Sequence, residues 1–297
     1  MAVLFDNFSD WKKASEVNNS PLFQAVIDFE IQQKGKTEEE IWEGVQAAFT
    51  VMKEAVVSGL TEDMSSHSGM IKNGAKKVMG YETPVLSLEF QKLISRALAA
   101  KEVNSCMGRV VAAPTAGASG ILPGVLVTLQ EIHDLSDRKI CEALLLGAGV
   151  ALILEKRASI AGSVGGCQAE TGSAAAMASA GITYCLGGSN DQILNAVAIT
   201  IQCMLGLICD PVAGLVEIPC VVRNASAAAI ANSSAQIALA DVNAVIPVDE
   251  CVDAMGEVGQ SMEERYKETA LGGLAATKTG QAISKRVLIQ DIEIEED

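Results

Sequence analysis

Three long segments of this sequence carry no charged residue, and they limit the folds that are open to the chain. They cover residues 110–130, 171–190 and 192–209. Segments of this length without charge have to be buried, either in a lipid bilayer or in a protein core. Prolines and glycines interrupt the first, Ala, Gly and Ser fill most of the second, and no aromatic belts or basic flanking loops accompany any of them. These features argue against membrane spans, so we expect buried helices and no membrane partner.

The aromatic residues are confined to one end of the sequence. All six Phe, both Trp and Tyr81 lie within residues 1–90 of the 297, which leaves only Tyr184 and Tyr266 beyond them. Since 49% of all residues are apolar, the chain can bury a large core, and disorder is excluded. The core beyond residue 90 must therefore consist of small aliphatic side chains.

The net charge limits the possible partners of the protein, and the cysteine content indicates its compartment. Lys and Arg number 22 against 37 Asp and Glu, and this net charge of −15 argues against a nucleic-acid partner. Eight cysteines are too few for a disulfide scaffold in a chain this long, and residues 1–10 lack the basic and apolar regions of a signal peptide. These observations predict a protein of the reducing cytoplasm.

Capping residues and helix breakers predict an all-α fold. Thr37 with Glu40, and Ser189 with Gln192, have the spacing of capping boxes. Extended patterns are confined to 110–113 and 287–294. No linker divides the chain, so we expect one domain over 1–297 with a solvated acidic tail at 291–297. Helices are predicted at 21–35, 37–59, 84–104, 121–133, 137–156, 167–186, 190–207, 219–240 and 248–263.

Three of the eight cysteines lie where Gly or Pro interrupts regular structure. Cys167 follows two glycines, Cys209 stands two residues before a proline, and Cys220 directly follows one. Thiolates that converge from separate elements can bind a metal, but the sequence has no C-x-x-C, so a metal site and a structural role both stay open. Zinc is disfavoured because most structural zinc sites need four ligands and neither His is near in sequence. Three thiolates without a fourth ligand suggest an iron–sulfur cluster with one iron left open.

A second candidate site is the loop 113–120, which leads into the helix predicted from Ile121. Its glycines and hydroxyls at a helix N-terminus offer N–H donors and a positive dipole end, which suit a carboxylate or a phosphate. It lacks the lysine of a P-loop, and a tight turn between helices is the structural alternative. The candidate substrate-binding residues of this loop are Thr115, Ala116, Gly117, Ser119 and Gly120.

Two shorter motifs supply further candidate groups. His67 and Ser68 are the catalytic candidates, with His67 either a base or merely an exposed residue, and Ser68 and Gly69 are also substrate-binding candidates. Arg223 and Asn224 follow Cys220. They could anchor a carboxylate through a bidentate guanidinium or simply lie on a helix surface.

Four long motifs occur in order along the chain: GRVVAAPTAGASGILPG (108–124), SIAGSVGGCQAETGSA (159–174), CDPVAGLVEIPCVVRNA (209–225) and GGLAATKTG (272–280). Together they resemble the α subunit of iron–sulfur-dependent L-serine dehydratase, also called L-serine ammonia-lyase. The likeness extends from about residue 37 to residue 280. It implies a multi-helix catalytic domain whose Gly-rich loops converge on a [4Fe-4S] cluster, with Cys167, Cys209 and Cys220 as the cysteine ligands.

The resemblance also implies a reaction and partners. An iron without a cysteine ligand acts as a Lewis acid in removing water from L-serine, and aminoacrylate then yields pyruvate and ammonia. A separate β subunit, an oligomer, and a role in amino-acid degradation and gluconeogenesis are expected. Pyridoxal phosphate is not expected, because the sequence contains no S-x-K-x-R-G or tetraglycine segment.

The sequence departs from the family pattern in two places. Residues 66–74 read SHSGMIKNG where many members show S-x-[ST]-G-[LM]-[TI]-G-G-D, so a glycine and an acid are lost. The tail 291–297 contains no cysteine, so the fourth iron should be open or bound to water or substrate. Two alternatives therefore stay open: a lyase acting on L-cysteine or another 3-substituted amino acid, and a non-catalytic cluster-binding subunit.

Overall fold

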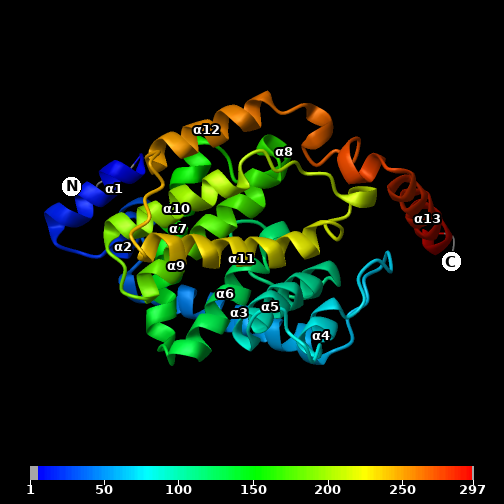
Figure 1. Cartoon of the computed structure of the whole chain (residues 1–297), viewed down its shortest axis with the longest axis horizontal. Helices are drawn as coiled ribbons and strands as arrows, with labels where there is room; N and C mark the ends of the chain where they lie inside the picture. The colour runs from blue at the N-terminus through cyan, green and yellow to red at the C-terminus, as the bar shows by residue number, and fades with distance from the viewer. Residues whose placement is uncertain (1–5, 296–297) are drawn as a thin grey trace.

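The computed structural model describes residues 6–295, with side chains to residue 289 (Figure 1). Within this part every regular element is helical, and β-type pairing is limited to two isolated bridges, Ser65 with Lys72 and Cys209 with Lys267. The predicted all-α class is confirmed. The α-helices are α1 (Phe8–Asn18), α2 (Leu22–Lys34), α3 (Glu38–Thr61), α4 (Gly74–Met79), α5 (Leu88–Ser105), α6 (Ile121–His133), α7 (Asp137–Arg157), α8 (Gly162–Gly165), α9 (Ser173–Cys185), α10 (Asn190–Met204), α11 (Cys220–Leu239), α12 (Val248–Ser261) and α13 (Lys278–Glu295). Short 3-10 turns cover Ala116–Ala118, Val212–Gly214, Glu264–Tyr266 and Gly273–Ala276, and a π turn covers Gln168–Gly172.

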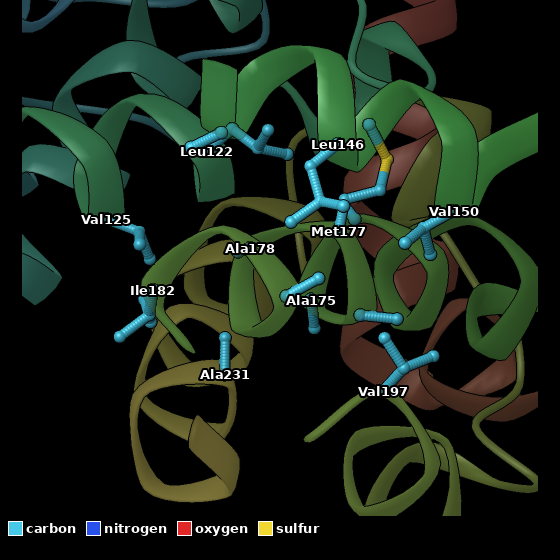
Figure 2. Packing of buried hydrophobic residues seen from close by; sticks show 14 of the residues in the cluster. Leu122, Val125, Leu146, Val150, Ala175, Met177, Ala178, Ile182, Val197 and Ala231 are labelled. Carbon is cyan, nitrogen blue, oxygen red and sulfur yellow. The ribbon is translucent and has the colours of Figure 1, made fainter. Parts of the chain in front are cut away.

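Helix α9 is a buried helix of mostly small residues at the centre of the core. It packs against α6, α7, α10 and α11. Figure 2 shows Ala175 and Met177 of α9 among Leu146 of α7 and Val197 of α10. Because small side chains allow helices to approach closely, aliphatic residues fill most of the part of this core that comes from beyond residue 90, as the composition predicts.

The aromatic residues of the first helices pack onto this aliphatic core. Phe8 and Trp11 of α1 are fully buried. A Cβ atom at Gly149 of α7 would lie 2.5 Å from the Trp11 ring, so glycine at this position makes room for the indole. The aromatic end of the sequence thus covers one side of the helix bundle.

The charge-free segments form the buried elements that the sequence predicts. Residues 121–130 belong to α6, and the other two segments form most of α9 and α10. No helix among residues 6–295 combines the length and the apolar composition that crossing a bilayer demands.

Helix boundaries agree with the capping residues where a cap was recognised. Thr37 with Glu40, and Ser189 with Gln192, both form complete capping boxes. Helix α2 ends at Gly35, whose φ of 67° is the left-handed conformation that glycine adopts at low cost.

The boundaries differ elsewhere for local reasons. The helix expected from residue 84 begins only at Leu88, because the Ser87 side chain accepts from Phe90 N and caps it there. Residues 287–294 are helical rather than extended. They continue α13, at whose start the Thr277 hydroxyl accepts from Gly280 N at 3.1 Å.

Four helices were not predicted at all: α1, α4, α8 and α13. The expected helix at 167–186 starts as the π turn and continues as α9, and the expected helix at 190–207 ends at Met204. For the acidic tail, the backbone to Glu295 belongs to α13, and the side chains of 291–297 lie outside the described residues.

Candidate functional site

Cys167, Cys209 and Cys220 are brought together from three separate elements. Cys167 lies between α8 and the π turn, Cys209 lies between α10 and α11, and Cys220 is the first residue of α11. All three are buried and none is in a disulfide. They are close enough for the charge on one to affect the ionisation of another: burial raises the pKa of the Cys220 thiol to about 12, and negative charge at Cys167 adds to the rise.

Glycine and the backbone place these thiols. Gly166 has a φ of 74° directly before Cys167, and a Cβ there would lie 2.6 Å from Met262 Sδ. A Cβ at Gly162 would lie 3.2 Å from Cys209 Sγ, so this glycine leaves space beside the sulfur. Cys209 N donates to Tyr266 O at 2.8 Å, which fixes the second cysteine against the segment that follows α12.

The donor set consists of three buried thiols, the type of side chain that binds an iron–sulfur cluster. Among the described residues, no three His, Cys, Asp or Glu side chains are placed around one metal position. In an iron–sulfur cluster each thiolate binds its own iron, so the three sulfurs need not converge on one point. Burial raises the pKa of Cys167 and of Cys209, so the thiolates need compensating positive charge. The chemistry of three buried, unlinked thiols therefore fits a cluster.

Two cations lie beside these thiols. Burial raises the pKa of both Cys167 and Cys220, and the charge of Arg223 opposes part of that rise. Its Nη1 is 2.8 Å from Asp210 Oδ1 and donates to Ile208 O at 3.0 Å. The guanidinium thus ties α11 to the segment of Cys209. Its predicted role as a carboxylate anchor stays a prediction.

Lys101 is the second cation, and the sequence did not reveal it. It is fully buried on α5, and its Nζ donates to Val216 O at 2.8 Å and to Asn104 Oδ1 at 2.5 Å. Burial lowers the pKa of Lys101 to about 8, while the negative charges of Cys220, Glu170 and Glu217 act in the opposite direction. No local pattern in the sequence of α5 marks this lysine, because Val216 and the acidic groups around it come from distant segments.

The loop 113–120 is joined to the helix that carries Cys220. Asn224, fully buried, donates from Nδ2 to Gly117 O and to Cys220 O, both at 2.8 Å. Its Oδ1 accepts from Gly120 N at 2.9 Å. Asn224 therefore positions the predicted anion-binding loop, and both polar atoms of its amide are bonded within the protein. In the same loop, the buried Ser119 hydroxyl has no hydrogen-bond partner within the described residues.

Glu170 is a buried carboxylate of this site that the sequence interpretation missed. Thr115 Oγ1 donates to Glu170 Oε1 at 2.5 Å. A Cβ at Gly117 would lie 2.4 Å from the same oxygen, so the carboxylate packs directly on that glycine. One signal could have found it: Glu170 is the only charged residue between Arg157 and Asp191.

Glu268 lies near the same place. Its backbone N donates to Cys209 O at 2.9 Å, and its φ is 65°. Burial raises the pKa of Glu268, and the charge of Glu170 raises it further. Two carboxylates thus flank the thiols, and together with Lys101 and Arg223 they make the site strongly charged inside a core of small residues.

The two catalytic candidates, His67 and Ser68, lie on opposite sides of the loop that carries them. Ser68 is buried and His67 is exposed. The hydroxyls of Ser66 and Ser68 both donate to Glu217 Oε2, at 2.6 Å and 2.5 Å. Gly69 adopts a φ of 71° at the turn. Ser68 therefore faces the interior through Glu217, whereas His67 lies on the outer side of the loop.

Comparisons with known proteins match most of this chain to one family. The family model described as "Serine dehydratase alpha chain" matches residues 17–275. The L-serine dehydratase, alpha chain, of Peptoniphilus asaccharolyticus is 44% identical over 270 residues, which cover 90% of this chain and 92% of that protein. The probable L-serine dehydratase, alpha chain, of Bacillus subtilis (strain 168) is 39% identical over 287 residues, covering 96% and 95%. The L-serine dehydratase of Streptomyces coelicolor is 39% identical over 259 residues, covering 84% of this chain and 56% of that protein.

Proposed function

Because the chain belongs to the serine dehydratase α-chain family, we propose that it is the catalytic subunit of an L-serine dehydratase. The reaction removes water from L-serine and releases pyruvate and ammonia by way of aminoacrylate. The observation that carries the proposal is the joining of the loop 113–120 to Cys220 through Asn224, with the buried thiols of Cys167 and Cys209 close by. The setting would be cytoplasmic, in amino-acid degradation and gluconeogenesis.

The proposed cofactor is a [4Fe-4S] cluster held by Cys167, Cys209 and Cys220, with one iron lacking a cysteine ligand. When bound, it supplies a Lewis acid that makes the substrate hydroxyl a better leaving group. The chain contributes burial, since all three thiols are shielded from water, and positive charge from Arg223 and Lys101 that favours the thiolate forms. No pyridoxal phosphate is required.

The substrate would lie beside the anion loop (residues 113–120) and the Glu170 carboxylate that packs on it. Ala118 N, Ser119 N and Gly120 N already have acceptors, so the backbone N–H groups of 115–117 and the N-terminus of α6 suit the carboxylate of L-serine. The Ser119 hydroxyl, which has no partner within the described residues, adds a donor. The Glu170 carboxylate, packed on Gly117, suits the ammonium group. Thr115 holds that carboxylate in place by its hydrogen bond.

The partner of this subunit would be a separate β subunit, within an oligomer. The names of the relatives from Peptoniphilus and Bacillus designate α chains, which supports a multi-subunit enzyme. Because His67 is exposed and the Ser68 hydroxyl is bound to Glu217, neither is well placed as the base of the reaction in this chain alone.

Anaerobic purification followed by a visible spectrum and a serine-to-pyruvate assay tests the proposal. We expect cluster absorbance and turnover, with the assay run both with and without a candidate β subunit. Cys209→Ser should abolish turnover even when pyridoxal phosphate is added, and full retention would reject the cluster. Faster pyruvate release from L-cysteine than from L-serine would favour the alternative lyase. A cluster without any turnover would favour the non-catalytic subunit.

A further inference from the structure

Glu217 is a buried carboxylate that the proposed reaction does not use. It is 5% exposed, and one of its oxygens, Oε2, accepts hydrogen bonds from both Ser66 and Ser68. These serines are 151 and 149 residues away in sequence. A buried carboxylate that receives two hydroxyl donors makes charge-assisted bonds, which are stronger than bonds between neutral groups.

The two serines belong to a small closed loop, residues 64–73, which we call the serine loop. Its ends are joined by Met64 N donating to Asn73 Oδ1 at 2.7 Å and Asn73 N donating to Met64 O at 3.2 Å. Inside it, Ser68 Oγ accepts from Met70 N at 3.1 Å. The loop thus keeps its own shape, and its attachment to the rest of the molecule depends on contacts such as those of Glu217.

The other side of Glu217 is fixed to the start of α11. Glu217 O accepts from Val221 N at 2.8 Å, one residue beyond Cys220. The preceding carbonyl, Val216 O, accepts from Lys101 Nζ at 2.8 Å. The carboxylate therefore stands on a backbone segment that Lys101 and α11 hold in place.

A second contact holds Ser68 from another direction. Arg286 of α13 donates from Nη2 to Ser68 O at 3.0 Å. The Ser68 hydroxyl is thus bound by an interior carboxylate and its carbonyl by an exposed arginine. Ser68 is therefore held from two sides, by Glu217 and by Arg286.

We propose that Glu217 is a positioning residue that fixes the serine loop, through Ser66 and Ser68, to the segment that carries Cys220. The proposal rests on the proposed function in one respect: it takes the serine loop, which carries the substrate-binding candidates Ser68 and Gly69, to form part of the serine-binding site. Glu217 itself does not touch the substrate. Loss of its carboxylate should loosen the loop and weaken substrate binding while leaving the three cysteines in place.

Amide hydrogen exchange of the anaerobically purified full chain provides the first test. In Glu217→Gln, exchange over residues 64–73 should be about tenfold faster, while exchange over 221–235 of α11 stays as in the wild type. The matched control is Asp249→Asn. Asp249 also accepts from a serine hydroxyl, Ser9 Oγ at 2.6 Å, as well as from Phe8 N and Arg157 Nη1. Asp249→Asn should therefore speed exchange near residues 8–9 and 157 and leave exchange of the serine loop unchanged. Unchanged exchange of the serine loop in Glu217→Gln would overturn the proposal.

Kinetics provide the second test. Glu217→Gln should raise the KM for L-serine about tenfold, with a smaller effect on kcat and with unchanged iron content. Because Glu217 and Ser68 are in contact, the effects of Glu217→Gln and Ser68→Ala on KM should not add in the double variant. Additive effects, or loss of iron in Glu217→Gln, would overturn the assignment.

Two provisions keep the result interpretable. If Glu217→Gln does not fold, Arg286→Ala loosens Ser68 from the exposed side and should still speed exchange of the serine loop; no change would count against the proposal. A wild-type protein without iron and without serine turnover would reject the proposed function. The exchange comparison would still test whether Glu217 holds the serine loop, because hydrogen exchange does not depend on turnover.

Discussion

At the scale of single residues, Gly117 leaves little room for change in the candidate site. A Cβ there would lie 2.4 Å from Glu170 Oε1 and 2.6 Å from its Cδ, so even alanine must displace the carboxylate. We expect Gly117→Ala to lower serine turnover at least about tenfold while the protein stays folded. Steady-state assays and circular dichroism measure the two effects. In Gly117→Ala/Glu170→Asp the shorter carboxylate makes room, and part of the activity should return; an unimpaired Gly117→Ala would contradict the contact.

Lys101 should make stability depend on pH in a recognisable way. Its pKa in the folded protein is lowered to about 8 from 10.5, so the folded state loses the proton before the unfolded state does. The charged ammonium therefore costs stability below pH 8, and that stability returns as pH rises towards 10.5. Relative to Lys101→Met, the wild type should gain about 1 kcal/mol between pH 8 and pH 9. Urea unfolding of the reduced, cluster-free proteins measures the difference, and a flat or opposite slope would refute the burial of the charge.

The residue scale also shows what sequence patterns can and cannot identify. The three cysteines could be singled out because glycines or prolines stand next to them, and Glu170 could have been, as the lone charge in a long neutral stretch. Lys101 and Glu217 could not. Val216, which binds Lys101, and Ser68, which binds Glu217, are 115 and 149 residues away in sequence, so only the fold brings these pairs together.

At the scale of elements, helix α5 is held by close backbone approaches from two sides. A Cβ at Gly59 of α3 would lie 2.3 Å from Ala99 O, and one at Gly124 of α6 would lie 2.7 Å from Ala97 Cβ. Since backbone atoms cannot move aside as a flexible side chain can, both helices need glycine to cross α5 at this distance. The same packing fixes the buried Lys101 on α5.

Gly59→Ala should therefore destabilise the protein in spite of alanine's higher helix propensity. Overpacking against the Ala99 carbonyl should lower the free energy of unfolding by about 2 kcal/mol. The control lies in the same helix: Gly44 has no atom within 4 Å of its virtual Cβ, so Gly44→Ala should stabilise by about 1 kcal/mol. Thermal or urea unfolding compares the two variants, and equal effects would disprove the close crossing.

Element boundaries were predictable where a local signal decides them. The capping boxes at Thr37 and Ser189, and the glycine that ends α2, depend on residues within one turn of the boundary. The start of α5 was misplaced because proline at 84 and serine at 87 are both valid start signals, and the Ser87 hydrogen bond prevails. Residues 287–294 have an alternating pattern typical of a strand, yet no strand pairs with them among residues 6–295, and they remain helical.

At the scale of the whole molecule, the candidate site joins segments that the chain order keeps apart. Cys167 follows α8, whereas Cys209 and Cys220 flank the connection that leads into α11. Small residues in α9 and α11 let these segments approach one another. The scarcity of aromatic residues beyond residue 90 therefore allows the close packing around the site. In the absence of a bound group, three buried thiols and two nearby carboxylates contribute little to holding the segments together.

Removal of the proposed cluster should therefore loosen two distant parts of the chain at once. Chelation of iron under anaerobic conditions should lower the Tm and speed amide exchange both over residues 162–172 and over 207–221, because three cross-links between these segments are lost. Cys203 is exposed, so Cys203→Ser should respond to chelation as the wild type does. Before chelation, Cys220→Ser should have a lower Tm than the wild type, and chelation should change the Tm of this variant little. If chelation left the Tm and both exchange patterns of the wild type unaltered, the three cysteines would not be joined by a metal group in the folded protein.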